Sequence, residues 1–237
     1  IVALVALSPV AYYFYKKNGL GEKTVSSGLI IGLVLGIASC LQQAGIETTT
    51  AGKAAFITAM YIVLVPIIGV FQGHRPDRRI IFALIFAVVG LYLLCVNESF
   101  TIGKGDLLVI LCAFAYTFQI VLIDYFAPKS NEVVMSFFMF VSMTVFCFVG
   151  MILFEEPSIE ALKPCISSIL YAGVFSSGVA YTLQIVAQKG TNPVIVSMIM
   201  SMESVFALLF GALILNERLS TREIIGCIVM LSAIIIC

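Results

Sequence analysis

The residues able to do chemistry in this 237-residue sequence are a few polar side chains inside long apolar runs. In the run Pro193–Leu215 the one residue with a formal charge is Glu203. A helix of about twenty apolar residues spans a bilayer, so this run predicts a membrane helix with a carboxylate near the midplane. Such a carboxylate is costly unless it is protonated, paired or open to a wet cavity. Glu203 is therefore expected either to bind a solute or a proton, or to join helices by a hydrogen bond.

The composition indicates an integral membrane protein. Hydrophobic residues make up 61% of the chain, charged residues 11%, and the mean hydropathy is +1.13. Soluble domains average about 25% charged residues. The net charge is zero, and no basic arm indicates nucleic acid as a partner. The lipid bilayer is the partner that this composition predicts.

Residues typical of enzymes are scarce. The single histidine, His74, lies in a loop without a zinc motif, and no G-x-S-x-G elbow is present. The seven cysteines form no C-x-x-C pair and lie mostly in apolar runs, as small buried hydrophobic residues do. We therefore expect no enzyme activity, no metal site, no disulfide framework and no cofactor.

The chain divides into nine apolar runs with short connections. They are Ile1–Tyr15, Val25–Ile46, Ala51–Gln72, Ile80–Val96, Asp106–Ala127, Val133–Phe154, Cys165–Ala187, Pro193–Leu215 and Glu223–Cys237. The connections leave no room for a soluble domain.

A shift of 142 residues aligns the chain with itself. It places Gly36–Gln42 on Gly178–Gln184, and both segments read G-x-A-x-x-L-Q. Continued without a gap to Gly69 on Gly211, the alignment contains nine identities in 34 positions. We interpret this as an internal repeat.

The repeat predicts an all-α membrane protein of two five-helix repeats. Residues 1–97 form the first repeat, which lacks its first helix and part of its second, and residues 104–237 form the second. An odd number of helices inserts the second copy upside down, as in many transporters. We expect an inverted pair with ten helices when complete, about nine here, and roughly fifty further residues before Ile1, enough for one span and half of another.

The charges of the turns predict which side faces the cytoplasm. One side has eight lysines and arginines and the other has five, and the more basic side is expected inside. The first set is Lys16, Lys17, Lys23, Arg75, Arg78, Arg79, Lys129 and Lys189; the second is Lys53, Lys104, Lys163, Arg218 and Arg222.

Polar residues inside the runs are the candidate binding residues. Under the repeat Glu203 falls on Tyr61 and Gln184 on Gln42, while side chains three apart in the fifth run share a helix face. Each could line a central cavity, or instead make hydrogen bonds between helices. The candidate substrate-binding residues are Gln42, Tyr61, Tyr116, Gln119, Gln184 and Glu203.

Two other patterns have structural interpretations. Lys53, one turn into its run, is expected to extend its ammonium to the membrane interface. Gly28, Gly32 and Gly36 recur every four residues, which is typical of a face on which helices pack closely.

Two segments half a chain apart resemble the paired motifs of EamA-type transporters, in the drug/metabolite transporter superfamily. They are TTAGKAAFITAMYIVLVP (Thr49–Pro66) and GTNPVIVSMIMSMESVFALLFGALILNERLS (Gly190–Ser220). GDLLVILCAFAYTFQIVLIDYFAP (Gly105–Pro128) is similar to the sixth helix of that family. The resemblance covers the chain from end to end. It implies a ten-helix bundle with cytoplasmic termini and a central cavity, and many such proteins export amino acids or other small metabolites.

The resemblance also bears on single residues. The Glu of the family's ninth helix corresponds to Glu203, and its G-E-R turn corresponds to Asn216-Glu217-Arg218, with Asn in place of Gly. The sixth helix of the family often has His where this chain has Gln119. Any polar or proton chemistry of the family at that position therefore does not carry over.

The function expected is export of a small metabolite, such as an amino acid, across the inner (plasma) membrane by alternating access, with protons as a candidate coupling ion. A sugar-phosphate or nucleotide-sugar carrier is the alternative within the superfamily. It would need two or more Arg or Lys at membrane depth to bind phosphate. A non-transporting membrane protein is the alternative from another class.

Overall fold

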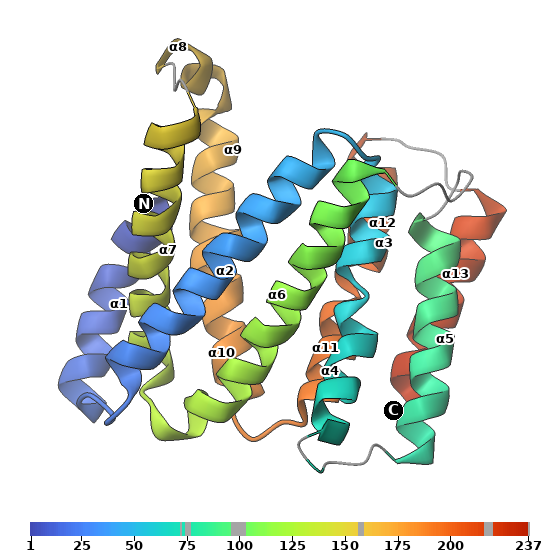
Figure 1. The fold of residues 1–237 in the computed structure, drawn as a ribbon, viewed down its shortest axis with the longest axis horizontal. Helices are drawn as coiled ribbons and strands as arrows, with labels where there is room; N and C mark the ends of the chain where they lie inside the picture. Colours follow the sequence, from blue (N-terminus) through green and yellow to red (C-terminus); the bar gives the residue numbers. More distant parts are fainter. Residues whose placement is uncertain (72, 74–76, 96–102, 156–158, 216–219, 237) are drawn as a thin grey trace. The chain divides into compact units, whose positions relative to one another are not determined.

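The chain is helical throughout the part that the structure describes. The computed structural model describes residues 1–71, 73, 77–95, 103–155, 159–215 and 220–236, and no strand occurs among them (Figure 1). His74, Arg75 and the Asn216-Glu217-Arg218 turn lie outside these residues. Within the described residues, seven stretches are long and apolar enough to cross a membrane: Thr24–Ile46, Ala51–Phe71, Arg78–Cys95, Lys104–Lys129, Glu132–Phe154, Lys163–Gln188 and Pro193–Ile214.

All nine predicted runs are helical in this part of the chain, and the protein is a multi-pass membrane protein. The elements are α1 (Val2–Asn18), α2 (Thr24–Ile46), α3 (Ala51–Thr58), α4 (Tyr61–Phe71), α5 (Arg78–Cys95), α6 (Lys104–Phe126), the 3₁₀ turn η1 (Ala127–Lys129), α7 (Glu132–Phe154), α8 (Ile159–Leu162), the 3₁₀ turn η2 (Lys163–Cys165), α9 (Ile166–Tyr171), the π-helix η3 (Ala172–Tyr181), α10 (Thr182–Gln188), α11 (Pro193–Met200), α12 (Glu203–Leu215) and α13 (Thr221–Ile236).

Three runs are not the single regular helices that the sequence predicted. Ala51–Gln72 is divided into α3 and α4, and Pro193–Leu215 into α11 and α12. Cys165–Ala187 contains the ten-residue π-helix η3 between α9 and α10. The pattern of apolar residues cannot distinguish a π-helix from an α-helix, because the two differ in the spacing of their backbone hydrogen bonds and not in residue type.

The described chain forms two compact units, each containing parts of both predicted repeats. Unit 1 consists of Ile1–Ile37 and Val121–Thr191, and unit 2 of Ala38–Ile120 and Asn192–Cys237. The compact units and the repeats are thus different divisions of the chain. The repeat limits near residues 97 and 104 stay a prediction.

In unit 1, Asn131 connects three helices at one end. Its Nδ2 donates to the carbonyls of Phe14 (3.2 Å) and Gly19 (3.0 Å), and its backbone N–H donates to Thr24 Oγ1 (3.0 Å). Its Oδ1 caps α7 by accepting from the Val134 N–H. Gly19 has a φ of 70°, which a residue with a side chain rarely adopts. The end of α1 and the starts of α2 and α7 are thereby fixed together.

Glycines of α2 allow α7 to approach closely within unit 1. A Cβ added at Gly32 would overlap the backbone of Met139, and one at Gly28 would lie 2.6 Å from the Met135 carbonyl oxygen. A Cβ at Gly36 would lie 2.9 Å from the ring of Phe146. The prediction that these three glycines form a packing face is confirmed. In lipid, such backbone approach supplies van der Waals contact that the hydrophobic effect cannot.

In unit 2, one apolar core joins α4, α5, α6, α11, α12 and α13. Its fully buried members include Ile62, Leu91, Met198 and Met230. Asn192 caps α11 by accepting the Val194 N–H at 2.9 Å, and Pro193 occupies the first turn, where a helix tolerates proline.

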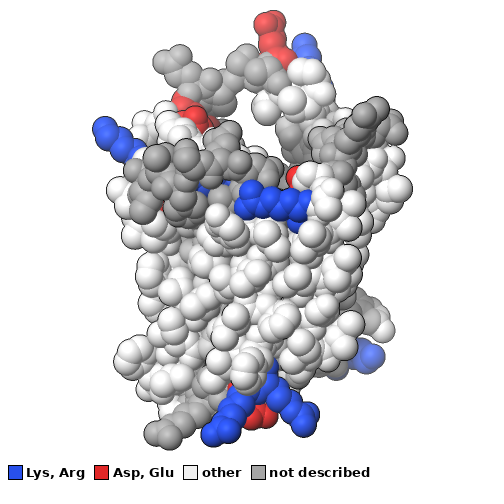
Figure 2. All heavy atoms as spheres, turned by 90° about the vertical axis from the view of Figure 1, so that its right-hand side faces the viewer, with Lys and Arg blue, Asp and Glu red and all other residues white. Residues whose placement is uncertain are grey.

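Helices α5 and α13 run antiparallel in unit 2 (Figure 1). A Cβ at Gly90 would meet the Met230 backbone nitrogen at 2.8 Å, and one at Gly226 would meet the Leu94 nitrogen at 3.0 Å. Gly90 of α5 thus lies opposite Met230 of α13, and Leu94 lies opposite Gly226. Because residue numbers increase along α5 where they decrease along α13, the two helices are antiparallel. The repeat predicts this opposite direction, since it matches α5 with α13. On the face shown in Figure 2, charged atoms gather at the two ends and leave an uncharged band between them.

We predict that Gly32→Ala lowers the thermal unfolding midpoint of the detergent-solubilised protein. The added methyl group would overlap the Met139 backbone, and overpacking of this kind costs about 1–3 kcal/mol. Gly150→Ala in α7 is the matched control, because no atom lies within 4 Å of its added Cβ. It should leave the midpoint unchanged or raise it. Equal midpoints for the two variants would contradict the close packing of α2 on α7.

We also predict that single cysteines at Arg78 and Thr221 are labelled from opposite faces of the membrane. These residues begin the antiparallel helices α5 and α13. The measurement is labelling by a membrane-impermeant maleimide in intact cells and in inverted vesicles, in a variant without the native cysteines. Labelling of both from the same face would contradict the inverted repeat.

Candidate substrate-binding site

Two broken helices give unit 2 its candidate site. The helix that begins at Ala51 breaks at Ala59 and Met60, and the one that begins at Pro193 breaks at Ser201 and Met202. Adding the repeat shift of 142 to 59 and 60 gives 201 and 202, so the breaks are repeat-equivalent. Matching interruptions in the two halves are what transporter repeats show at a binding site.

The backbone passes each break in a tight turn rather than an open loop. Met60 N–H bonds to the Ile57 carbonyl and Met202 N–H to that of Ile199, both at 3.1 Å. These bonds reach three residues back, as in a 3₁₀ helix. In the second copy the Ser201 hydroxyl also donates to the Met198 carbonyl at 2.6 Å, which competes with regular helix bonding. No side chain in the first copy explains its break.

Each break is followed at once by a candidate residue. Tyr61 begins α4 and Glu203 begins α12, so both lie in the middle of their membrane spans. Tyr61 belongs to the apolar core that also contains Met202 and Val205, the neighbours of Glu203. The Tyr61 side chain lies within electrostatic range of Glu203 and of Tyr116. Two residues that the repeat predicts to be equivalent therefore lie at the same apolar core of unit 2, Tyr61 within it and Glu203 between two of its members.

Their exposure differs, however. Tyr61 is only 6% exposed, whereas Glu203 is exposed on α12. No ion pair to Glu203 occurs among the residues that the structure describes. A carboxylate that is not buried within its own protein unit, halfway along a membrane span, needs water, a proton or a ligand for stability.

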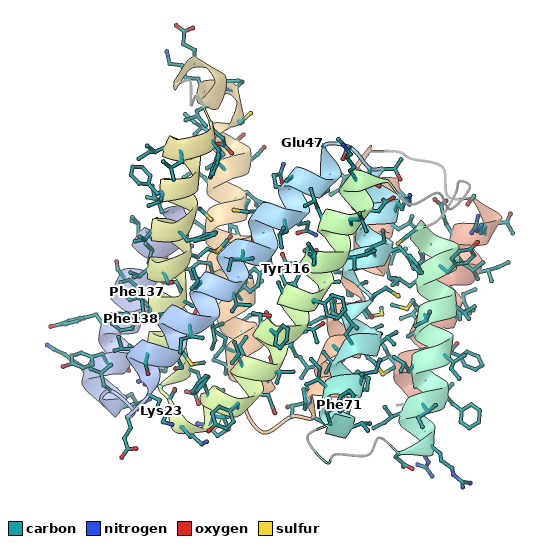
Figure 3. The ribbon with its side chains drawn as sticks, viewed as in Figure 1. Lys23, Glu47, Phe71, Tyr116, Phe137 and Phe138 are labelled. Atoms are coloured by element: carbon teal, nitrogen blue, oxygen red, sulfur yellow. The ribbon has the colours of Figure 1, made fainter. Side chains whose placement is uncertain are left out.

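A hydrogen-bond chain connects α6, α2 and α3 beside these residues. The Tyr116 hydroxyl donates to Gln42 Oε1 at 3.1 Å, and Gln42 Nε2 donates to Thr58 Oγ1 at 3.3 Å. Figure 3 shows Tyr116 near the middle of α6. Gln42 and Tyr116, two candidates from separate runs, thus touch directly. Thr58 was not predicted, since nothing in its run sets it apart.

The two remaining candidates are glutamines with unsatisfied polar atoms. Gln119 on α6 is fully buried, and neither its Nε2 nor its Oε1 has a hydrogen-bond partner in the described part of the chain. Gln184 lies on α10 in unit 1, half-buried, and its Nε2 likewise lacks a partner there. Unsatisfied buried amides cost about 1–3 kcal/mol, which a water or ligand would offset. Five candidates therefore lie in unit 2 and one in unit 1.

A buried ion pair in unit 2 was missed by the sequence analysis. Asp106, 2% exposed, accepts from Lys53 Nζ (2.5 Å), from Thr49 Oγ1 (2.6 Å) and from the Gly103 N–H (2.6 Å). Lys53 thus pairs with a carboxylate of α6, which the sequence analysis did not predict, while its extension to the membrane interface stays a prediction. Asp106 is the third residue of α6, where an acidic side chain commonly caps the helix, and this position was the available signal.

The described residues offer no other chemical centre. No group of three His, Cys, Asp or Glu among them could bind a metal, and no disulfide joins the cysteines among them. The candidate site in unit 2 thus consists of hydroxyls, amides and one carboxylate.

We predict that Asp106→Ala strongly lowers thermal stability. It removes the carboxylate from a partly buried Lys53, and breaking such a pair costs about 3–5 kcal/mol. Adding Lys53→Met to Asp106→Ala should restore part of the lost stability, because the ammonium is then absent. Glu47→Ala, at an exposed carboxylate just after α2 (Figure 3), is the control and should change the midpoint little. A double variant as unstable as the sum of the singles would contradict the pairing.

Comparison with known proteins agrees on one family. The profile of the EamA-like transporter family matches residues 1–96 and 103–237. An uncharacterized transporter of Archaeoglobus fulgidus is 33% identical over 211 residues, which are 86% of this chain and 67% of the relative. A crystal structure of another protein matches 99% of this chain and 93% of that chain with a TM-score of 0.72. At 15% identity, the last likeness shows the fold alone.

Proposed function

Because the chain belongs to the EamA-like transporter family, we propose that it moves a small metabolite, an amino acid or similar solute, across the plasma membrane by alternating access. Export is the direction that we propose. The family is one of transporters, within the drug/metabolite transporter superfamily, and the multi-pass helical architecture accords with transport.

The observation that carries the mechanism is the pair of repeat-equivalent helix breaks. In alternating access the binding site lies near the membrane midplane. The two repeats move against each other around it, so that the site opens first to one side of the membrane and then to the other. The breaks at Ala59–Met60 and Ser201–Met202 lie in the middle of their spans and precede Tyr61 and Glu203. Packing of α4 against α11 brings the second half of one broken helix to the first half of the other. This crossed contact supports a shared site in unit 2.

The polar groups around the breaks support solute binding. The hydrogen-bond chain of Tyr116, Gln42 and Thr58 lies at this site. The side-chain amide of Gln119 has no hydrogen-bond partner among the described residues and is available to a solute. In our proposal these groups and Glu203 bind the solute, and Glu203 is also the group that could exchange a coupling proton. Gln184, in unit 1, stays in the proposal as a binding residue on the strength of its repeat match to Gln42.

No observation favours a sugar-phosphate or nucleotide-sugar carrier. A phosphate group calls for Arg or Lys at membrane depth. Lys53 comes nearest to this, and its ammonium pairs with Asp106.

The test is flux through purified protein in liposomes, with Glu203 changed to Ala and to Gln. We expect Glu203→Ala to reduce flux at least about tenfold, since a lost charge-assisted hydrogen bond costs roughly 1.5–3 kcal/mol and 1.4 kcal/mol is a factor of ten. Glu203→Gln keeps the shape but cannot ionise. If Glu203→Gln retains most of the flux, the role of Glu203 is hydrogen bonding. If Glu203→Gln loses the pH dependence of flux, the role of Glu203 is proton exchange.

The control is Glu47→Gln, at an exposed carboxylate after the end of α2, which should transport like the wild type. If both Glu203 variants also transport like the wild type, or if both fail to fold, Glu203 is a structural residue and the site assignment is wrong.

A further inference from the structure

The charged groups of unit 2 are distributed unevenly along its helices. The described lysines and arginines all lie within the first three residues of a helix: Lys53 of α3, Arg78 and Arg79 of α5, Lys104 of α6 and Arg222 of α13. Among the described acidic residues of this unit, Glu203 alone lies in the middle of a membrane span. The described middle of unit 2 therefore has one acidic side chain and no basic one.

Two of the described basic groups of unit 2 have identified contacts. The Lys53 ammonium pairs with Asp106, which also accepts from Thr49 and Gly103. The Arg222 guanidinium lies 5.3 Å from the centre of the Tyr92 ring, near the start of α13. Neither contact involves Glu203. A negatively charged solute beside Glu203 would thus meet a like charge with no described cation at that depth.

The neutral groups beside Glu203 suit a cation as well. Tyr61 lies within electrostatic range of the carboxylate, and Tyr116 packs against the same core as Tyr61. Aromatic faces attract cations, most strongly when desolvated. The hydroxyl and amide oxygens of Tyr116, Gln42 and Thr58 can accept hydrogen bonds from an ammonium group.

We infer that the solute carries a positive charge, as a protonated amine does, and that Glu203 binds that amine directly. This inference rests on the proposed function and narrows its solute class. An ammonium group beside Glu203 makes a neutral pair, which is far less costly in a membrane than a lone carboxylate. A solute whose charge is negative overall is excluded on the same ground.

The test uses three ligands that share one side chain and differ in charge. Phenylalaninamide is a cation at pH 7, phenylalanine is a zwitterion and N-acetylphenylalanine is an anion; leucinamide, leucine and N-acetylleucine form a second, aliphatic series. Affinity of the detergent-solubilised wild type is measured by isothermal calorimetry and by the rise in thermal midpoint that a ligand of the folded state produces. We expect the amide of at least one series to bind at least about tenfold more tightly than the N-acetyl form, a difference of about 1.4 kcal/mol.

Variants then assign the preference to Glu203. Glu203→Gln should bring the affinities of cation and anion within about threefold of each other, while Glu203→Asp and the control Glu47→Gln should keep the preference for the cation. Equal or tighter binding of the N-acetyl forms by the wild type overturns the inference. So does a cation preference that survives Glu203→Gln, or the absence of binding by every member of both series. The comparison of ligands on the wild type decides the question even if a Glu203 variant fails to fold.

Flux measured in liposomes separates this inference from the proposed function. Transport of an anion that does not depend on Glu203 overturns the charge preference and leaves transport intact. Binding of the cation without flux of any solute supports the charge preference and overturns transport.

Discussion

A membrane interior stabilises no isolated charge, and the described helices satisfy this requirement in two different ways. Asp106 is almost fully buried, and Lys53, Thr49 and Gly103 surround its carboxylate with donors. Glu203 has no such partner in the described chain and is exposed halfway along its span. One carboxylate thus has donors within the protein, whereas the other has none among the described residues. The contacts support a structural role for Asp106, and a binding role for Glu203 stays our proposal.

The backbone near Glu203 is placed by close helix contacts elsewhere in unit 2. α5 and α13 approach through Gly90 and Gly226, where either added Cβ would meet backbone atoms of the other helix at 2.8–3.0 Å. The core that these helices share with α4 and α12 includes Tyr61 and Val205. Tight packing of this kind restricts side chains to few positions. The residues that follow the two breaks are accordingly presented on a rigid scaffold.

Sequence reasoning predicted the helices because a bilayer demands long apolar runs, and it predicted the α2 packing face because glycine spacing has few other causes there. It also selected Gln42 and Tyr116, whose contact the structure confirms, although their role in binding stays a prediction. It missed the helix breaks, since no glycine or proline marks Ala59–Met60 or Ser201–Met202. It missed the Lys53–Asp106 pair because those residues are 53 positions apart, and only the fold brings them together. Features of this kind depend on the tertiary structure and cannot be predicted from local residue patterns.

The Lys53–Asp106 pair also limits the order in which the chain can assemble during synthesis. Lys53 is translated before α4, α5 and α6, so its ammonium lacks Asp106 as a partner while α4 and α5 are synthesised. Its place in the first turn of α3 allows the long side chain to remain at the headgroup region during that time. Asp106 enters at the start of α6, and only then can the two charges leave water together. Burial of the pair is therefore a late event of biogenesis, and it joins α3 to α6 only after the helices between them are in place.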